Sequence, residues 1–167
     1  MAVADMIGAA VGVILLVIVA YLLVGSVLSI SQTVTSAQKS ATLLEEKQLK
    51  TDFYISQAER NSTGINCTIT NNGNEPISDF TQMDVYIYDN STGIYQMYPY
   101  VSSTSGTPDP GTWTTYSIGN DFIHPGELDP GDTLGILVVI PWTTDPSPSP
   151  ARIQITTANA VSASLRI

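Results

Sequence analysis

The stretch Met6–Ile30, MIGAAVGVILLVIVAYLLVGSVLSI, decides the architecture of this chain because it runs for about 25 residues without a charge. A helix of about 20 apolar residues is long enough to cross the hydrocarbon core of a membrane. A cleaved signal peptide is a weaker interpretation, because no Lys or Arg precedes the run and the run exceeds the usual length of such a segment. The sequence therefore predicts an apolar helix that crosses a membrane or packs among other apolar helices.

The helical pattern continues past the uncharged run, and no Gly or Pro interrupts residues 26–50. Its apolar positions recur at intervals of four and three residues, which is typical of one face of an amphipathic helix. We therefore expect a single helix of about 48 residues, roughly 70 Å long, with a seam that contacts other helices. The seam consists of Ile30, Val34, Ala37, Ala41 and Leu44.

Small and acidic residues near the N-terminus indicate helix packing. Gly8 and Gly12 have the small-xxx-small spacing that lets apolar helices approach closely. Asp5 is the only charge before Lys39, and a carboxylate in an apolar bundle needs a partner or a proton. We predict that Asp5, Gly8 and Gly12 take part in helix–helix contact, with a neighbouring α-amino group as the partner of Asp5. If the helix only spans a membrane, Asp5 marks its polar boundary.

Residues 52–167 have a different pattern, with short alternating apolar and polar runs separated by Ser, Thr, Asn, Gly and Pro. Such a pattern predicts seven or eight antiparallel strands in an immunoglobulin-like β-sandwich. The chain is thus expected to be α+β, with a helix over residues 1–50 and one extracellular domain over residues 52–167. The predicted strands lie at 52–58, 65–70, 82–89, 93–101, 113–118, 133–142, 152–156 and 161–167, and the continuous apolar run of 133–142 is expected to be central.

Three sites match the N-x-[ST] pattern of N-glycosylation, at Asn61, Asn66 and Asn90. Asn66 alternates with Ile65 and Cys67, so it is expected to face the solvent when those two side chains face the core. The two other asparagines lie in predicted turns. These sites place the domain outside the cell, although the lysines that follow the apolar run favour the opposite topology. We give more weight to the glycosylation sites because whole domains are translocated largely regardless of charge.

The composition excludes several classes of function. A net charge of −9 with six basic residues leaves too little positive charge for nucleic acid or a polybasic membrane surface. Cys67 and His124 are the only residues of their types, and no nucleophile, phosphate-binding or metalloprotease motif is present. We therefore predict a non-enzymatic protein without a cofactor, in which Cys67 is a core residue.

Two further groups of residues have alternative interpretations. The acidic loop with Glu127, Asp129 and Asp132 offers oxygen ligands for Ca²⁺, but its Pro-Gly composition favours a turn before a strong strand, so no metal is predicted. Outward tyrosines of a predicted hairpin form a surface for sugars or proteins, or pack across strands on the outer face of the sheet. These tyrosines are Tyr86, Tyr88, Tyr95 and Tyr98.

The complete layout resembles the archaeal surface-filament superfamily, which comprises archaellins, archaeal type IV pilins and the archaellum accessory proteins F and G. The uncharged start, the amphipathic continuation TSAQKSATLLEEKQLKT and the sandwich carry this resemblance. The segments CTITNNGNEPISDFTQMDVYIYD, HPGELDPGDTL and TANAVSAS are most similar in pattern to the F accessory family. The resemblance implies a helix in a filament core or a membrane, with the sandwich outside.

The resemblance also implies partners and a location. A filament subunit of this kind is a homo-oligomer of many copies at the cell surface, held in the membrane during biogenesis and processed by removal of a leader. Pilins often carry an acid at mature position five, which Asp5 occupies if Met1 is the mature start. The alternatives are a membrane-anchored, stator-type accessory whose sandwich binds the surface layer, and an anchored surface adhesin.

Overall fold

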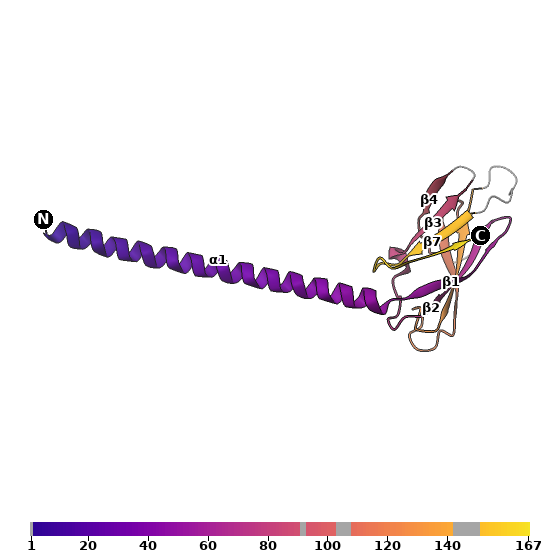
Figure 1. The fold of residues 1–167 in the computed structure, drawn as a ribbon, viewed down its shortest axis with the longest axis horizontal. Coiled ribbons are helices and arrows are strands. Elements are labelled where there is room, and N and C mark those ends of the chain that lie inside the picture. Colours follow the sequence, from indigo (N-terminus) through magenta and orange to yellow (C-terminus); the bar gives the residue numbers. More distant parts are fainter. Residues whose placement is uncertain (1, 91–92, 103–107, 142–150) are drawn as a thin grey trace. The chain divides into compact units, whose positions relative to one another are not determined.

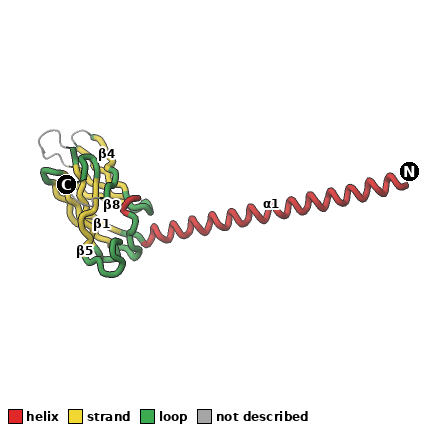
Figure 2. The backbone as a smooth tube through the Cα atoms, turned by 180° about the vertical axis from the view of Figure 1, so that it is seen from behind, coloured by secondary structure: helices red, strands yellow, loops and turns green. Residues whose placement is uncertain are grey.

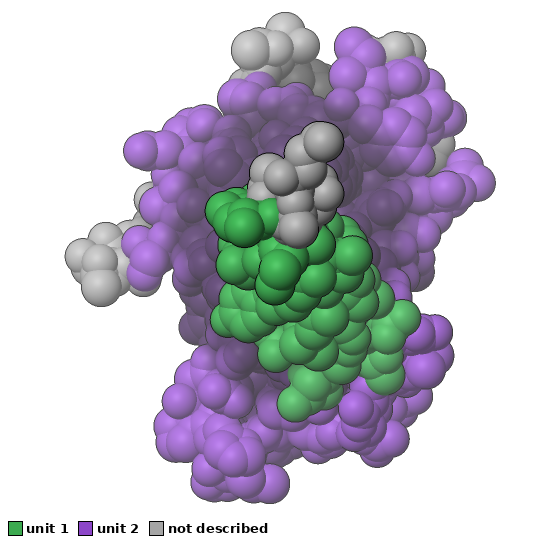
Figure 3. All heavy atoms as spheres, turned by 90° about the vertical axis from the view of Figure 1, so that its left-hand side faces the viewer, with its two compact units in different colours: residues 1–44 green, residues 45–167 purple. Residues whose placement is uncertain are grey.

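The computed structural model describes residues 2–90, 93–102, 108–141 and 151–167, apart from the side chains of residues 2, 4, 5 and 151. It contains one long helix, α1 (Ala2–Lys50), followed by a β-sandwich (Figures 1 and 2). The chain divides into two compact units, Met1–Leu44 and Glu45–Ile167, coloured separately in Figure 3. The expected single helix is therefore confirmed, and its 49 residues have the length that the pattern predicts.

In the described part of the chain, eight strands build two antiparallel four-stranded sheets. The first sheet has the order β1-β2-β6-β5 and the second the order β4-β3-β7-β8. The predicted α+β class and the central position of the run at 133–142 are both confirmed, since β6 lies between β2 and β5. The strands are β1 (Phe53–Arg60), β2 (Gly64–Asn71), β3 (Asp84–Asp89), β4 (Ile94–Tyr98), β5 (Trp113–Gly119), β6 (Thr133–Val139), β7 (Ala151–Thr156) and β8 (Ser162–Arg166).

The core lies between the two sheets, and strands such as β2 and β3 contribute alternate residues to it. In β2, Ile65, Cys67 and Ile69 are buried, while Asn66 faces the solvent. Alternation of this kind is what a strand with one covered face requires, because successive side chains point to opposite faces. Trp113, which is fully buried, packs edge-on against Tyr100 with ring centroids 4.8 Å apart.

Helix α1 ends where the chain turns into the sandwich. The Thr51 amide donates to the carbonyls of Lys47 and Gln48, and the Asn74 amide donates to the Lys50 carbonyl at 2.8 Å. A Cβ atom on Gly73 would lie 2.5 Å from the Lys50 carbonyl oxygen, so this close backbone approach requires glycine. The turn between β7 and β8 reaches the same place, since Asn159 Nδ2 donates to Thr51 Oγ1 at 3.0 Å. The sandwich thus has a helix-proximal end, defined by Thr51, and a distal end.

Candidate interaction surfaces

The surface of α1 is a long apolar area that the described residues leave uncovered. Every described side chain from Met6 to Lys50 is exposed, including Leu16 at 71% and Val34 at 48%. By length and composition α1 is able to cross a membrane. Residues of this kind each contribute about 1.5–3 kcal/mol when fully buried, so a lipid phase or other protein must cover this helix.

The predicted packing residues of α1 all lie on this helix. A Cβ atom added to Gly8 or Gly12 would meet no described atom within 4 Å apart from the neighbouring backbone of the helix itself. The seam residues are also exposed. Asp5 lies within α1, but its side chain is outside the described part of the structure. A packing role for these residues therefore stays a prediction.

At the helix-proximal end of the sandwich, the loop between β5 and β6 is held by a histidine–aspartate pair. His124 Nδ1 lies 2.8 Å from Asp129 Oδ1, and the His124 amide donates to Asp129 Oδ2 at 3.0 Å. The side-chain hydrogen bond raises the pKa of His124 and lowers the pKa of Asp129, because it favours the charged form of each group. Asp121 closes the loop by accepting the Gly126 amide with both carboxylate oxygens at 3.1 Å.

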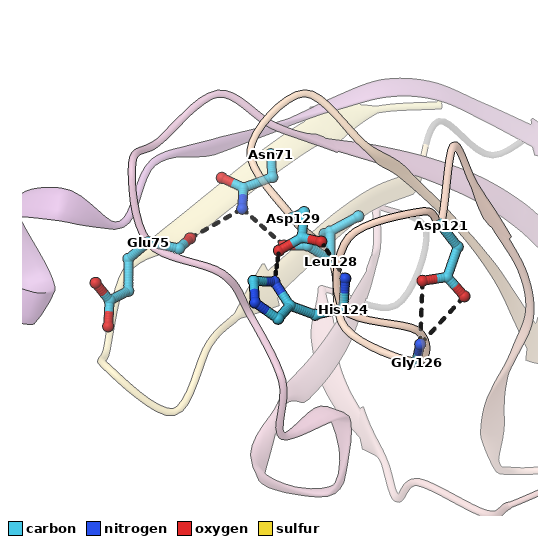
Figure 4. Close-up of polar contacts among 7 residues, drawn as sticks. All are labelled: Asn71, Glu75, Asp121, His124, Gly126, Leu128 and Asp129. Carbon is cyan, nitrogen blue, oxygen red and sulfur yellow. Dashed lines mark hydrogen bonds and ion pairs between the residues drawn. The ribbon is translucent and has the colours of Figure 1, made fainter.

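A second loop is fastened to the first by Asn71, whose side chain is fully buried (Figure 4). Its Nδ2 donates to the carbonyls of Glu75 and Leu128 at 2.9 and 2.8 Å, and its Oδ1 accepts the Gly73 amide. Ile77 and Leu128 add a backbone bridge between the loops. We call residues 71–79 and 120–132 the end loops. Their exposed or partly exposed acids are Glu75, Asp79, Asp121 and Glu127, whereas Asp129 and Asp132 are buried.

The end loops also contain the residues considered for a metal. Ligand atoms of His124, Glu127 and Asp129 lie within 4.8 Å of one another. Asp132 belongs to the turn instead, since its amide donates to the Asp129 carbonyl. Both oxygens of Asp129 already accept hydrogen bonds from His124. These hydrogen bonds give His124, Asp129 and Asp132 a structural role in closing the turn.

The structure corrects one of the four predicted surface tyrosines. Tyr86, Tyr88 and Tyr95 lie on the outer face of their sheet, and the rings of Tyr88 and Tyr95 are 4.6 Å apart. Tyr98 is 3% exposed and belongs to the core, so its assignment to the surface is wrong. The reason is the two-residue period of a strand, since Tyr95 and Tyr98 are three residues apart and point to opposite faces.

Two arginines beside these tyrosines were not singled out from the sequence. Arg152 pairs with Tyr88 on one side and with Arg166 on the other, so the three residues follow one another across β3, β7 and β8. Both arginines are exposed. Only the strand register brings them together, because β8 and β3 lie far apart in the sequence. We call Arg152, Arg166, Tyr88 and Tyr95 the arginine–tyrosine patch.

The predicted glycosylation sites are accessible. Asn61, Asn66 and Asn90 are all exposed, although Ser91 and Thr92 of the third site lie outside the described residues. Asn61 Oδ1 accepts the amides of Thr63 and Gly64 in a turn. Glycosylation itself stays a prediction. Cys67 is buried as predicted, and desolvation raises the pKa of its thiol to about 12.

Comparison with known proteins places the chain among archaeal proteins. It is 30% identical over 129 residues to an uncharacterized protein of Archaeoglobus fulgidus, covering 76% of this chain and 74% of that protein. The chain belongs to the family of this archaeal protein. No protein-family model matches the chain.

Three solved structures with a similar fold are archaellum proteins by their names. The periplasmic stator protein FlaG of Sulfolobus acidocaldarius aligns with a TM-score of 0.51 and 24% identity, covering 70% of this chain and 99% of that one. A chain of the FlaF–FlaG stator complex from the same organism aligns at 0.50 and 23%, covering 69% and 87%. Flagellin FlaB1 of Methanocaldococcus jannaschii aligns at 0.52 and 14%, covering 70% and 88%. These likenesses confirm the predicted sandwich fold, which this chain shares with the three archaellum proteins.

Proposed function

We propose that this protein is a non-enzymatic structural subunit of an archaeal surface filament, with the α1 helices bundled in its core and the sandwich outside. The observation that carries this proposal is the uncovered apolar surface of α1. This surface continues beyond the uncharged run along the seam, where Val34 and Leu44 stay 48% and 64% exposed. A simple membrane anchor needs about 20 apolar residues, whereas a helix that packs among copies of itself uses such an extension.

The fold supports this proposal from a second direction. A flagellin and two stator chains share the arrangement of strands over 69–70% of this chain. These proteins are components of an archaellum by their names, and none is named as an enzyme. The proposed location is the cell surface, with the apolar helix held in the membrane before assembly.

The test is assembly of the full chain after removal of detergent, followed by negative-stain microscopy and pelleting. Wild-type protein is expected to form fibres. Ala37→Glu introduces a charge into the seam, which must then be buried without a partner, so fewer fibres are expected. Thr35→Glu is the matched control, because Thr35 lies on the opposite flank of the same helical turn and is equally exposed. Monodisperse particles of the wild type under all conditions would refute the proposal.

A second function is favoured by the sequence identity, which is 24% to the stator protein FlaG and 14% to the flagellin. In this alternative, α1 spans the membrane and the sandwich binds a partner outside the cell, such as the surface-layer protein. Capture from archaeal envelopes with the detergent-solubilised full chain tests it. Recovery of a surface-layer protein, together with no fibres from the wild type, would favour the accessory role over the filament subunit.

A further inference from the structure

Two like charges stand side by side on the outer face of the second sheet. Arg152 of β7 and Arg166 of β8 are directly opposite in the register, and both are exposed. Side chains opposite each other in an antiparallel pair lie about 5 Å apart at Cβ, and like charges there are destabilising. Among the residues that the structure describes, neither arginine has an ion-pair partner. An anionic partner from outside the chain would relieve this repulsion.

The surroundings of the two arginines suit a protein contact. Tyr88 is the next residue across the sheet from Arg152, and its ring packs at 4.6 Å against Tyr95, which is 53% exposed. Tyrosine and arginine are enriched at the centres of protein interfaces, because both offer apolar area together with hydrogen-bond donors. Arginine also binds carboxylates with two parallel hydrogen bonds.

The patch lies at the distal end of the sandwich. The turn between β7 and β8 contacts Thr51 through Asn159, so the start of β7 and the end of β8 lie at the end of the sandwich opposite Thr51. Arg60, at the end of β1, lies at the same distal end. The sandwich has no other Lys or Arg, since the remaining three basic residues belong to α1.

The helix-proximal end of the sandwich is rich in acids, while the distal end carries Glu59 and Asp89 beside its arginines. The acids of the helix-proximal end come from the end loops and the adjoining starts of β1 and β3, whereas Lys50 of α1 is paired with Glu46 at 2.6 Å. Glu75 and Glu127 are partly exposed, and Figure 4 shows the Glu75 carboxylate pointing away from Asn71. The described acids of this end are Asp52, Glu75, Asp79, Asp84, Asp121, Glu127, Asp129 and Asp132.

We propose that the arginine–tyrosine patch of one copy binds the acidic end loops of a second copy, with Arg152 and Arg166 facing Glu75 and Glu127. The contact then joins two different surfaces, one from each copy. A contact of this type repeats into an open filament when the rotation between neighbouring copies does not close a ring. Charge complementarity favours a second copy because the outer face of the second sheet carries exposed Arg152 and Arg166, whereas the end loops carry partly exposed Glu75 and Glu127. This inference rests on the proposed filament function, and it assigns the lateral contact of the outer domains.

The experiment measures the lowest protein concentration at which the full chain forms fibres. Arg152→Gln and Arg166→Gln are each expected to raise this concentration several-fold, and the double variant about tenfold, because each removes one charge pair from the contact. Gln57→Glu is the control. Like each arginine variant it lowers the net charge by one, but it does so at exposed Gln57 of β1, in the other sheet. Wild-type assembly is expected to weaken from about 0.05 M to about 0.5 M NaCl, where screening shortens the range of charges.

A charge exchange identifies the partner surface. The double variant Arg152→Glu/Arg166→Glu and the double variant Glu75→Lys/Glu127→Lys are each expected to assemble poorly alone and to form mixed fibres together. Wild-type fibres with unchanged assembly of all arginine variants would overturn this inference and leave the filament function intact. Absence of wild-type fibres would overturn both. Loss of binding to polygalacturonate by the arginine variants, with normal fibres, would identify an acidic polysaccharide as the partner instead and overturn the second copy.

Discussion

Replacing Asn71 with alanine tests whether one buried side chain holds the end loops together. The substitution removes three hydrogen bonds, which join Nδ2 to the carbonyls of Glu75 and Leu128 and Oδ1 to the Gly73 amide. The Leu128 carbonyl keeps a partner, because it also accepts the Ile77 amide at 3.0 Å. The Gly73 amide and the Glu75 carbonyl, which are partly buried, lose their partner, and such a loss costs a buried group about 1–3 kcal/mol.

The free energy of unfolding of the sandwich should therefore fall by about 3 kcal/mol. With a urea dependence of about 2 kcal/mol per molar, the unfolding midpoint shifts down by roughly 1.5 M. The assay is urea unfolding of the full chain in detergent, followed by tryptophan fluorescence, for which fully buried Trp113 is a suitable reporter.

Asn72→Ala is the matched control for this prediction. Asn72 is exposed, and its side chain makes a single hydrogen bond of 3.2 Å to Asp52 Oδ2. Its removal should change the stability by about 0.5 kcal/mol or less. Equal midpoints for Asn71→Ala and Asn72→Ala would show that the loops hold without the buried amide, and the reasoning about the end loops would be refuted.

Three further outcomes are expected. The His124 pKa is raised from 6.5 and the Asp129 pKa is lowered from 3.8, so the pair stabilises the fold fully between pH 3.8 and pH 6.5. Stability should fall as the pH rises through the His124 pKa and as it drops below 3.8. Urea midpoints measured at several pH values should show that His124→Gln removes the fall on the alkaline side. Cys67, with a pKa of about 12, should react with Ellman's reagent at pH 8 only after unfolding, and rapid reaction of the native chain would contradict its burial. Tyr98→Ala should destabilise the sandwich by about 3–5 kcal/mol and Tyr95→Ala by about 1 kcal/mol, and similar thermal midpoints for the two variants would contradict their different burial.

Local patterns in the sequence predict most of the elements. The run Met6–Ile30 and the spacing of the seam predict one helix, and α1 is continuous over Ala2–Lys50. Alternation predicts the strands within a few residues, because a strand with one covered face needs an apolar residue at every second position. The same rule places Tyr95 and Tyr98 on opposite faces of the strand. The sequence was therefore sufficient to assign Tyr98 to the core.

The sequence alone determined that this chain is an apolar helix followed by an acidic, turn-rich sandwich, because both depend on the periodicity of neighbouring residues. The pairing of β6 with β2 and β5, and of β3 with β7, was decided only by the tertiary structure, since these contacts join strands far apart in the chain. The same holds for the arginine–tyrosine patch and for the bonds from Asn71 to the loop of Leu128. Composition gives the number of charges, but only strand register decides that Arg152 and Arg166 lie side by side on one sheet face, away from the acids of the end loops.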